Sequence, residues 1–192
     1  MNSLNDVKQQ IEAYRPWNEQ EAQDRTVLLK YMNIFDDLLV RENELIHLTA
    51  SGWIFDQAHT KVLMVYHNIY DSWGWTGGHA DGDADLLHVA QKEAREETGI
   101  QSLTVLREEI LSLDILPVWR HMKRGKPISS HQHANITYLL EADENQALIV
   151  KPDENQGVKW ILINEMKQYV SEPDMLPIYD KLNQKAKAML HE

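Results

Sequence analysis

The 192-residue sequence contains no cysteine. Disulfide bonds, cysteine-ligated zinc and a cysteine nucleophile are therefore excluded. It also lacks any apolar run near the roughly 18 residues that a membrane-spanning helix needs. The first residues show no basic segment followed by an apolar one, as a secretion signal would. Together these absences favour a cytoplasmic protein with no membrane partner.

Basic residues are scarce. Lysine and arginine number 19 against 30 aspartates and glutamates, which gives a net charge of −11 with neutral histidine. Such a surface repels the phosphate backbone of a long nucleic acid, so a nucleic-acid polymer is not an expected partner. A small anion held by a metal ion and a local basic group remains compatible with this charge. Hydrophobic residues make up 43% of the chain, which is typical of one ordinary globular domain.

The pattern of apolar residues predicts an α/β (α+β) protein. Helices are expected over 3–14 and 19–40, the second with Asn18 as its N-cap and Glu21 completing a capping box. Strand-like runs follow at 46–55, 61–67, 74–77, 103–116, 134–142 and 158–163. Helices are also expected over 84–98, ended by Gly99, and over 174–189. We therefore expect an α/β/α sandwich with a mixed sheet.

This pattern of elements predicts two regions in the chain. Residues 1–45 form a helical N-terminal extension, which carries no obvious chemistry and serves either in packing or as the surface of a homodimer. Residues 46–192 form the main domain.

An acidic cluster on the 84–98 helix carries the chemistry. Glu93 and Glu97 are four residues apart, so their carboxylates lie one turn apart on one helix face, with Glu96 beside them. Their mutual repulsion would be relieved by a divalent cation, and all-oxygen ligands favour Mg²⁺ or Mn²⁺. The alternative is a solvated acidic face with Lys92 and Arg95 as counter-charges. The preceding Gly77-Gly78 pair, whose backbone can approach an anion or a metal closely, favours the metal site.

At this point residues 77–100 resemble the signature box of the Nudix hydrolase family. The matching positions are Gly78, Glu93, Ala94, Glu96, Glu97, Gly99 and Ile100. The likeness continues outward to the segments 47–51 (HLTAS) and 154–160 (ENQGVKW), and it suggests a bacterial subgroup with a helical N-terminal extension. The resemblance implies a Nudix-like sandwich over 46–192. It also implies a pyrophosphohydrolase that cleaves a diphosphate linkage in a nucleoside diphosphate joined to another group.

The resemblance assigns roles to the acidic residues. Glu93 and Glu97 are the expected principal metal ligands, and Glu96 is either a third ligand or the base that deprotonates the attacking water. The Gly78 carbonyl is a further candidate ligand. Glu154, in a later loop, is either an additional catalytic carboxylate or a solvated loop residue.

Two positions depart from the family box, because Ala84 replaces its early glutamate and Lys92 replaces its arginine. In the family these residues brace the loop and helix, so their loss favours a slower enzyme or an alternative function. That alternative is a non-catalytic nucleotide-binding or regulatory module with the same fold. The isomerase branch that acts on isoprenoid diphosphates relies on a cysteine, and RNA decapping conflicts with the net charge. The substrate itself stays open.

Basic and histidine side chains are the candidates for substrate binding. His79 lies inside the box loop and could donate to a phosphate oxygen, or simply stabilise the turn. His131 and His133 alternate before a strand, so they share one face and could reach the substrate together. Arg120, Lys123 and Arg124 belong to a basic segment, 120–126, that is either a phosphate-binding loop or solvated surface. A zinc site is not expected, since no third histidine lies at suitable spacing.

Overall fold

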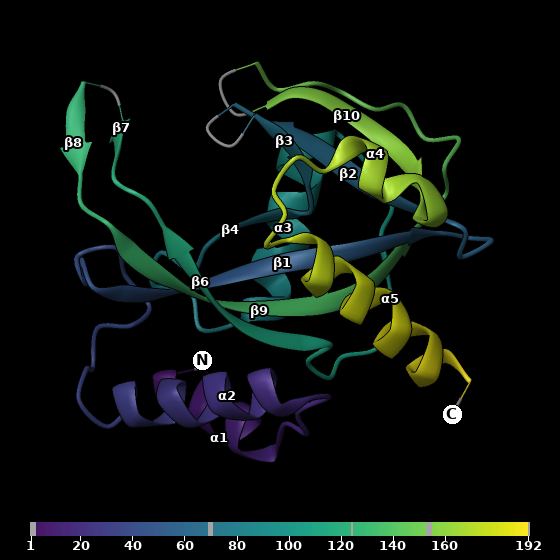
Figure 1. Cartoon of the computed structure of the whole chain (residues 1–192). Coiled ribbons are helices and arrows are strands. Elements are labelled where there is room, and N and C mark those ends of the chain that lie inside the picture. Colours follow the sequence, from purple (N-terminus) through teal and green to yellow (C-terminus); the bar gives the residue numbers. More distant parts are fainter. Residues whose placement is uncertain (1–2, 69–70, 124, 153–154, 192) are drawn as a thin grey trace.

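The computed structural model describes residues 3–68, 71–123, 125–152 and 155–191 of the chain. A mixed β-sheet lies at the centre, with helices on both of its faces and a helical pair at one end (Figure 1). This arrangement confirms the expected α/β/α sandwich with a mixed sheet.

The sheet is built around one long central strand. Its main path runs β10 (Asn155–Leu162), β2 (Lys61–His67), β1 (Ile46–Asp56), β9 (His131–Ala142) and β5 (Thr104–Val105). Three further strands join it: β3 (Ser72–Gly74) pairs with β2, β4 (Thr76–His79) with β1, and β6 (Ser112–Val118) with β9. The β1–β9 pair is parallel and the other pairs are antiparallel. A separate hairpin of β7 (His121–Lys123) and β8 (Lys126–Ile128) projects from the body (Figure 1).

The helices are α1 (Leu4–Ala13), α2 (Glu19–Tyr31), α3 (Leu86–Thr98), α4 (Met166–Tyr169) and α5 (Leu176–Leu190), with a 3₁₀ turn at Ile163–Glu165. Gly99 ends α3 in a left-handed conformation (φ 76°), which is the predicted helix stop. Within the described ranges, no helix is both long and apolar enough to span a bilayer.

Apolar clusters cover both faces of the sheet at β1, and alternating side chains of this strand enter opposite clusters. Trp53 and Phe55 on β1 pack in one apolar cluster with Leu182 of α5. Ile54, between them, packs on the opposite face with Ala94 of α3. Every residue of β1 is buried, as expected for a central strand covered on both sides.

Four details of the sequence-based prediction are wrong. The strand expected over 74–77 falls across two strands, β3 and β4, with Trp75 between them. The helix expected over 19–40 ends at Tyr31, because the following residues turn to meet the sheet, where the Leu38 carbonyl accepts from the Leu48 N–H at 2.7 Å. The strand expected over 103–116 is two strands, β5 and β6. Asn18 does cap α2, but Glu21 does not complete a capping box: its carboxylate accepts from the Trp17 N–H at 2.6 Å.

Glu21 is instead fully buried and joins the extension to the rest of the chain. It pairs with Lys181 and Lys185 of α5 and accepts a 2.6 Å hydrogen bond from the Tyr14 hydroxyl. Burial alone would raise the pKa of Glu21, but the donors and ammonium groups around it lower that pKa overall. The extension is thus packed against its own chain.

Candidate active site

The glycine pair and the acidic helix face meet beside strand β1. Gly77 and Gly78 of β4 pair with Ser51 and Ala50 of β1, and α3 begins after a short loop and packs back against both strands. A Cβ atom on Gly78 would lie 2.4 Å from the carboxylate carbon of Glu93. Only glycine at this position therefore lets the Glu93 side chain lie so close to the backbone.

The three box glutamates differ in environment. Glu97 is buried and its Oε2 accepts from the Gly77 N–H at 3.0 Å. The Glu93 side chain is 16% exposed, whereas that of Glu96 is 44% exposed. Glu93 and Glu97 are therefore held against the loop, and Glu96 faces solvent.

Lys92, at the position of the family arginine, contacts two of these carboxylates. Its Nζ lies 3.2 Å from Glu93 Oε1 and 3.8 Å from Glu96 Oε1. The hydrogen bond to Glu93 raises the pKa of Lys92. Ala84, at the position of the early glutamate, is buried in the core. Lys92 therefore offsets the negative charge of Glu93 and Glu96, whereas residue 84 contributes no charged side chain.

Asp83 and Asp85, on either side of Ala84, act at the start of α3. Asp85 is the N-cap and accepts from the His88 N–H at 3.0 Å. Asp83 accepts from the Asp85 N–H at 2.8 Å and contacts His88 Nδ1 at 2.9 Å. Both carboxylates fix the helix N-terminus.

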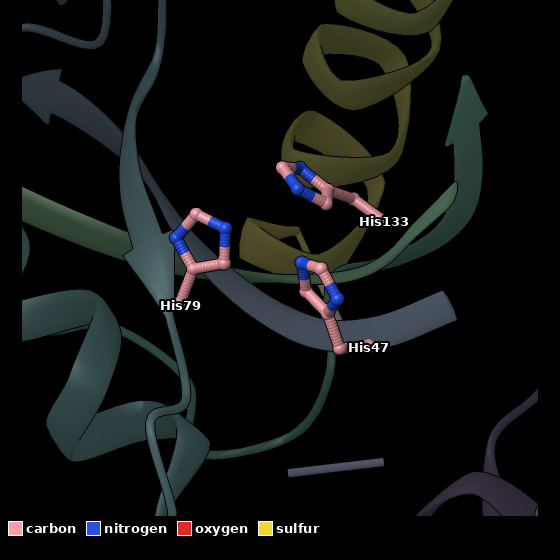
Figure 2. Close-up of side chains that lie close together, drawn as sticks. All are labelled: His47, His79 and His133. Carbon is pink, nitrogen blue, oxygen red and sulfur yellow. The ribbon is translucent and has the colours of Figure 1, made fainter. Parts of the chain in front are cut away.

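Four histidines gather on the sheet near this loop. The ring centroid of His133 lies 4.8 Å from that of His79 and 5.1 Å from that of His131. The predicted pairing of His131 with His133 on one face is thus confirmed, with their Nε2 atoms 3.3 Å apart. His47 of β1 completes the group, 5.0 Å from the His133 ring (Figure 2).

The expectation that no third histidine would join them is wrong. One side-chain nitrogen each of His47, His79 and His133 lies within 4.8 Å of the others. Spacing along the chain did not reveal this, because the three residues come from strands that meet only in the sheet. Burial, followed by the neighbouring histidines, lowers the pKa of His133 to about 2, and burial also lowers the pKa of His47.

A cavity of about 360 Å³ lies beside these groups. Its lining includes Gly77, Gly78, His79, Glu97 and His133. A buried amide lies in its wall: Asn135 Oδ1 accepts from both Thr49 Oγ1 and Ser51 Oγ at 2.9 Å. Sequence reasoning missed this polar group, although Thr49 and Ser51 alternate on β1 within the HLTAS segment. A larger cavity of about 930 Å³, between the extension and α5, contains none of the box glutamates.

The remaining predicted residues lie elsewhere or outside the described residues. Arg120 is exposed beside the β7–β8 hairpin, where its N–H donates to Ser130 Oγ at 3.1 Å. Lys123 belongs to β7, so the basic segment is a projecting hairpin rather than an irregular loop. Arg124 and Glu154 fall outside the described residues.

Comparison with known proteins agrees with this geometry. The NUDIX domain model matches residues 45–182. The fold resembles a Nudix hydrolase from M. smegmatis, RenU (TM-score 0.55, 16% identity, 74% of this chain and 86% of that one). It also resembles the NUDIX domain of Shewanella oneidensis NrtR complexed with ADP ribose (0.53, 17%, 82% and 97%). A third similar structure is a C. elegans Ap4A hydrolase binary complex (0.51, 21%, 75% and 97%).

No curated protein gave a significant match to the sequence. The family model nevertheless covers most of the chain, including the glycine pair, the acidic helix and the four histidines. The chain therefore belongs to the Nudix family.

Proposed function

We propose that this protein is a divalent-metal-dependent hydrolase that cleaves a diphosphate linkage in a nucleoside diphosphate joined to another group. The observation that carries the proposal is the position of Glu93 and Glu97. The Glu93 carboxylate lies against Gly78, and Glu97 bonds to Gly77 in the wall of the 360 Å³ cavity. One carboxylate on the pocket wall and a second against the neighbouring glycine offer the oxygen ligands that a phosphate-bound hard cation requires.

The residues present fit such a cation. Glu93, Glu97 and the Gly78 carbonyl would supply oxygen ligands, and the missing Cβ of Gly78 leaves room for Glu93. An all-oxygen set favours Mg²⁺ or Mn²⁺. Once bound, the cation would supply Lewis-acid stabilisation of the charge that gathers on the phosphate oxygens.

The chain supplies the other parts of the reaction. Glu96 is open to solvent, so it is available either as a third ligand or as the base that takes a proton from the attacking water. The Gly77 N–H holds Glu97 in one orientation. His79 and His133, on the cavity lining, are available as hydrogen-bonding groups for the substrate.

We infer a small nucleotide derivative as substrate. A cavity of about 360 Å³ falls in the usual range for small-molecule sites, roughly 300–1,000 Å³. Two of the structures with a similar fold are named for such compounds, Ap4A and ADP ribose. The basic hairpin with Arg120 and Lys123 is our candidate for additional phosphate contacts.

A second candidate is a nucleotide-binding module without catalysis. The observation that favours it is the contact of Lys92 with Glu93 and Glu96. A lysine ammonium group already balances these carboxylates, which reduces the electrostatic gain from a metal ion. The same compounds would then bind without being cleaved.

Turnover of a nucleotide panel distinguishes the two. The panel contains ADP-ribose, diadenosine tetraphosphate, nucleotide sugars and oxidised dNTPs, each with Mg²⁺, with Mn²⁺ or with chelator. For ADP-ribose, diadenosine tetraphosphate and nucleotide sugars, the products are detected as phosphate after addition of a phosphatase. For oxidised dNTPs, which a phosphatase would attack directly, release of pyrophosphate is followed with inorganic pyrophosphatase instead. We expect metal-dependent release, reduced about 100-fold or more in Glu97→Gln, since metal stabilisation is worth several kcal/mol.

Glu12→Gln is the matched control, because Glu12 is an exposed glutamate in α1. It should retain wild-type turnover. Calorimetry with the same compounds would detect binding without cleavage, and that result would replace the hydrolase by the binding module. Equal turnover in wild type and Glu97→Gln would refute the assignment of Glu97.

A further inference from the structure

The three histidines His47, His79 and His133 form a compact group that the proposed hydrolase chemistry does not use as ligands. The register of the sheet explains their convergence. His47 of β1 is the direct partner of His133 on β9, and Thr49, two residues along β1, is the partner of His79 on β4. Residues two apart on a strand face the same side, so all three imidazoles project from one face of the sheet (Figure 2).

The hydrogen bonding of His47 prepares its other nitrogen for a ligand. His47 Nδ1 lies 2.9 Å from the Asn43 carbonyl oxygen, which can only accept, so Nδ1 carries the proton. Nε2 therefore has a free lone pair. It is buried, on a side chain only 4% exposed, and has no hydrogen-bond partner among the described residues. A ring that donates through one nitrogen to a carbonyl and offers the other is the usual arrangement of a metal-binding histidine.

The distances suit one small metal ion. The three nitrogens lie within 4.8 Å of one another. Tetrahedral coordination at about 2.0–2.1 Å would place them about 3.4 Å apart. Metal binding would therefore require the side chains to rotate toward one another. Burial lowers the pKa of both His47 and His133, which favours the neutral imidazole that binds a metal.

The surrounding charges are balanced. Arg41 and Asp81 both act on His47, but they form a two-bond ion pair with each other, with Arg41 Nε 2.6 Å from Asp81 Oδ1. His131 adds a fourth imidazole at the edge, its ring 5.0 Å from that of His47. Because the Arg41–Asp81 pair carries no net charge, it adds little repulsion against a cation at the centre of the group.

We propose that His47, His79 and His133 bind one transition-metal ion of the Zn²⁺ class. Imidazole ligands suit Zn²⁺, Co²⁺, Ni²⁺ and Cu²⁺, in contrast to the oxygen ligands of the glutamate site. Three protein ligands leave a fourth position open, as in catalytic rather than structural zinc sites. His79 and His133 line the same cavity as Glu97, so the ion would lie beside the proposed substrate site.

Metal binding itself is the test, and it needs no turnover. The full chain is stripped with chelator, and binding of Zn²⁺ and Co²⁺ is followed by calorimetry and by the visible absorption of tetrahedral Co²⁺. We expect one ion per chain, with the Co²⁺ band, in the presence of excess Mg²⁺. His79→Ala and His133→Ala should each weaken binding by more than about 10-fold, since even loss of an outer-sphere partner has that effect.

Two variants should keep the metal. Glu97→Gln alters the oxygen site and should leave Zn²⁺ and Co²⁺ binding unchanged, so this proposal and the hydrolase proposal can fail separately. His191→Ala removes an exposed histidine at the far end of α5 and controls for surface binding. Circular dichroism checks that each variant is folded.

The proposal is overturned if the stripped chain binds neither Zn²⁺ nor Co²⁺. It is also overturned if folded His79→Ala and His133→Ala bind as tightly as wild type. Loss of Co²⁺ binding in Glu97→Gln, with retention in the histidine variants, would move the ion to the carboxylates.

Discussion

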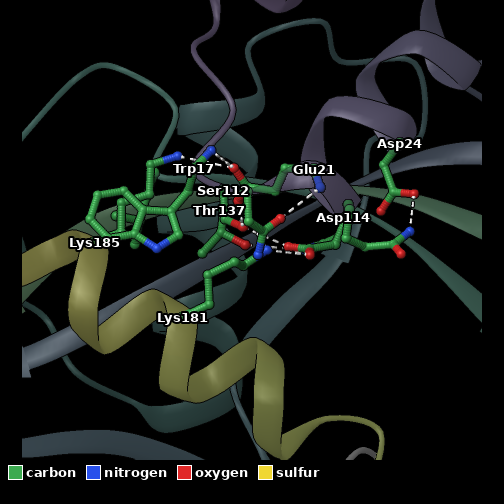
Figure 3. Close-up of polar contacts among 12 residues, drawn as sticks. Trp17, Glu21, Asp24, Ser112, Asp114, Thr137, Lys181 and Lys185 are labelled. Atoms are coloured by element: carbon green, nitrogen blue, oxygen red, sulfur yellow. Dashed lines mark hydrogen bonds and ion pairs between the residues drawn. The ribbon is translucent and has the colours of Figure 1, made fainter.

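The ammonium group of Lys181 lies 2.9 Å from the carboxylate of Glu21, so a buried ion pair joins the helical extension to the last helix (Figure 3). Lys181 also contacts Asp114 of β6, and Lys185 lies 3.4 Å from Glu21. The three elements α2, β6 and α5 therefore share one set of buried charges.

Replacing Glu21 should destabilise the fold. Glu21→Ala leaves two buried lysines with a single carboxylate, and breaking a buried pair in this way costs about 3–5 kcal/mol in the free energy of unfolding. Urea denaturation measures the change. Glu19→Ala, an exposed glutamate in the same helix, should cost less than about 1 kcal/mol. Equal losses in the two variants would contradict a structural role for the buried pair.

The two glycines of β4 should respond differently to alanine. The atoms nearest to a Cβ on Gly78 all belong to the movable side chain of Glu93, whereas a Cβ on Gly77 lies 2.8 Å from the Ala50 backbone oxygen. Gly78→Ala should therefore weaken Mg²⁺ activation and turnover while thermal stability changes little. Gly77→Ala should lower the melting temperature, because the backbone of β1 would have to move to relieve the overlap. Kinetics and thermal melts on both variants test the contrast, and a stable Gly77→Ala would refute it.

Replacing Lys92 by arginine should affect turnover less than replacing it by a neutral residue. Its Nζ contacts Glu93 and Glu96, and a guanidinium group can engage both carboxylates with fixed geometry. We expect Lys92→Arg to keep or raise kcat/KM, and Lys92→Met to lower it as the carboxylates lose their orientation. A loss greater than about 10-fold in Lys92→Arg, roughly 1.4 kcal/mol, would argue against this positioning role.

His67 should make stability depend on pH. Burial lowers the pKa of His67, whose Nε2 donates to the Trp75 carbonyl at 3.1 Å. Below pH about 6.5, the ordinary pKa of histidine, His67 binds a proton in the unfolded chain but stays neutral in the folded chain. The free energy of unfolding therefore decreases as the pH falls. Because His67 is only half-buried in the folded chain, we expect a loss of at most about 1 kcal/mol between pH 7 and 5.

Urea denaturation at pH 7 and pH 5 measures this effect. His67→Gln cannot titrate and should flatten the pH dependence relative to wild type. Other buried histidines will keep part of the slope. An unchanged slope in His67→Gln would show that His67 does not contribute.

Local patterns were sufficient to predict α3 and the start of α2. The periodic apolar residues, the Asn18 cap and the Gly99 stop involve contacts within a few residues, so the sequence predicts them directly. The close approach of Glu93 to Gly78 is also foreseeable, because the two lie on one short strand–loop–helix unit. Errors occurred where the tertiary structure overrides propensity, as at the end of α2, which stops at Tyr31.

The amino-acid sequence by itself determined the family, the acidic helix face and the order of the main elements, since these depend on residue type and short spacing. Only the tertiary structure decided which distant residues meet. His47 and His133 are 86 positions apart, yet the parallel register of β1 and β9 places them side by side. Glu21 and Lys181 meet because α2 packs on β6, and Lys181 of α5 also contacts Asp114 of that strand. Strand register and packing, unlike helical spacing, are properties of the whole chain.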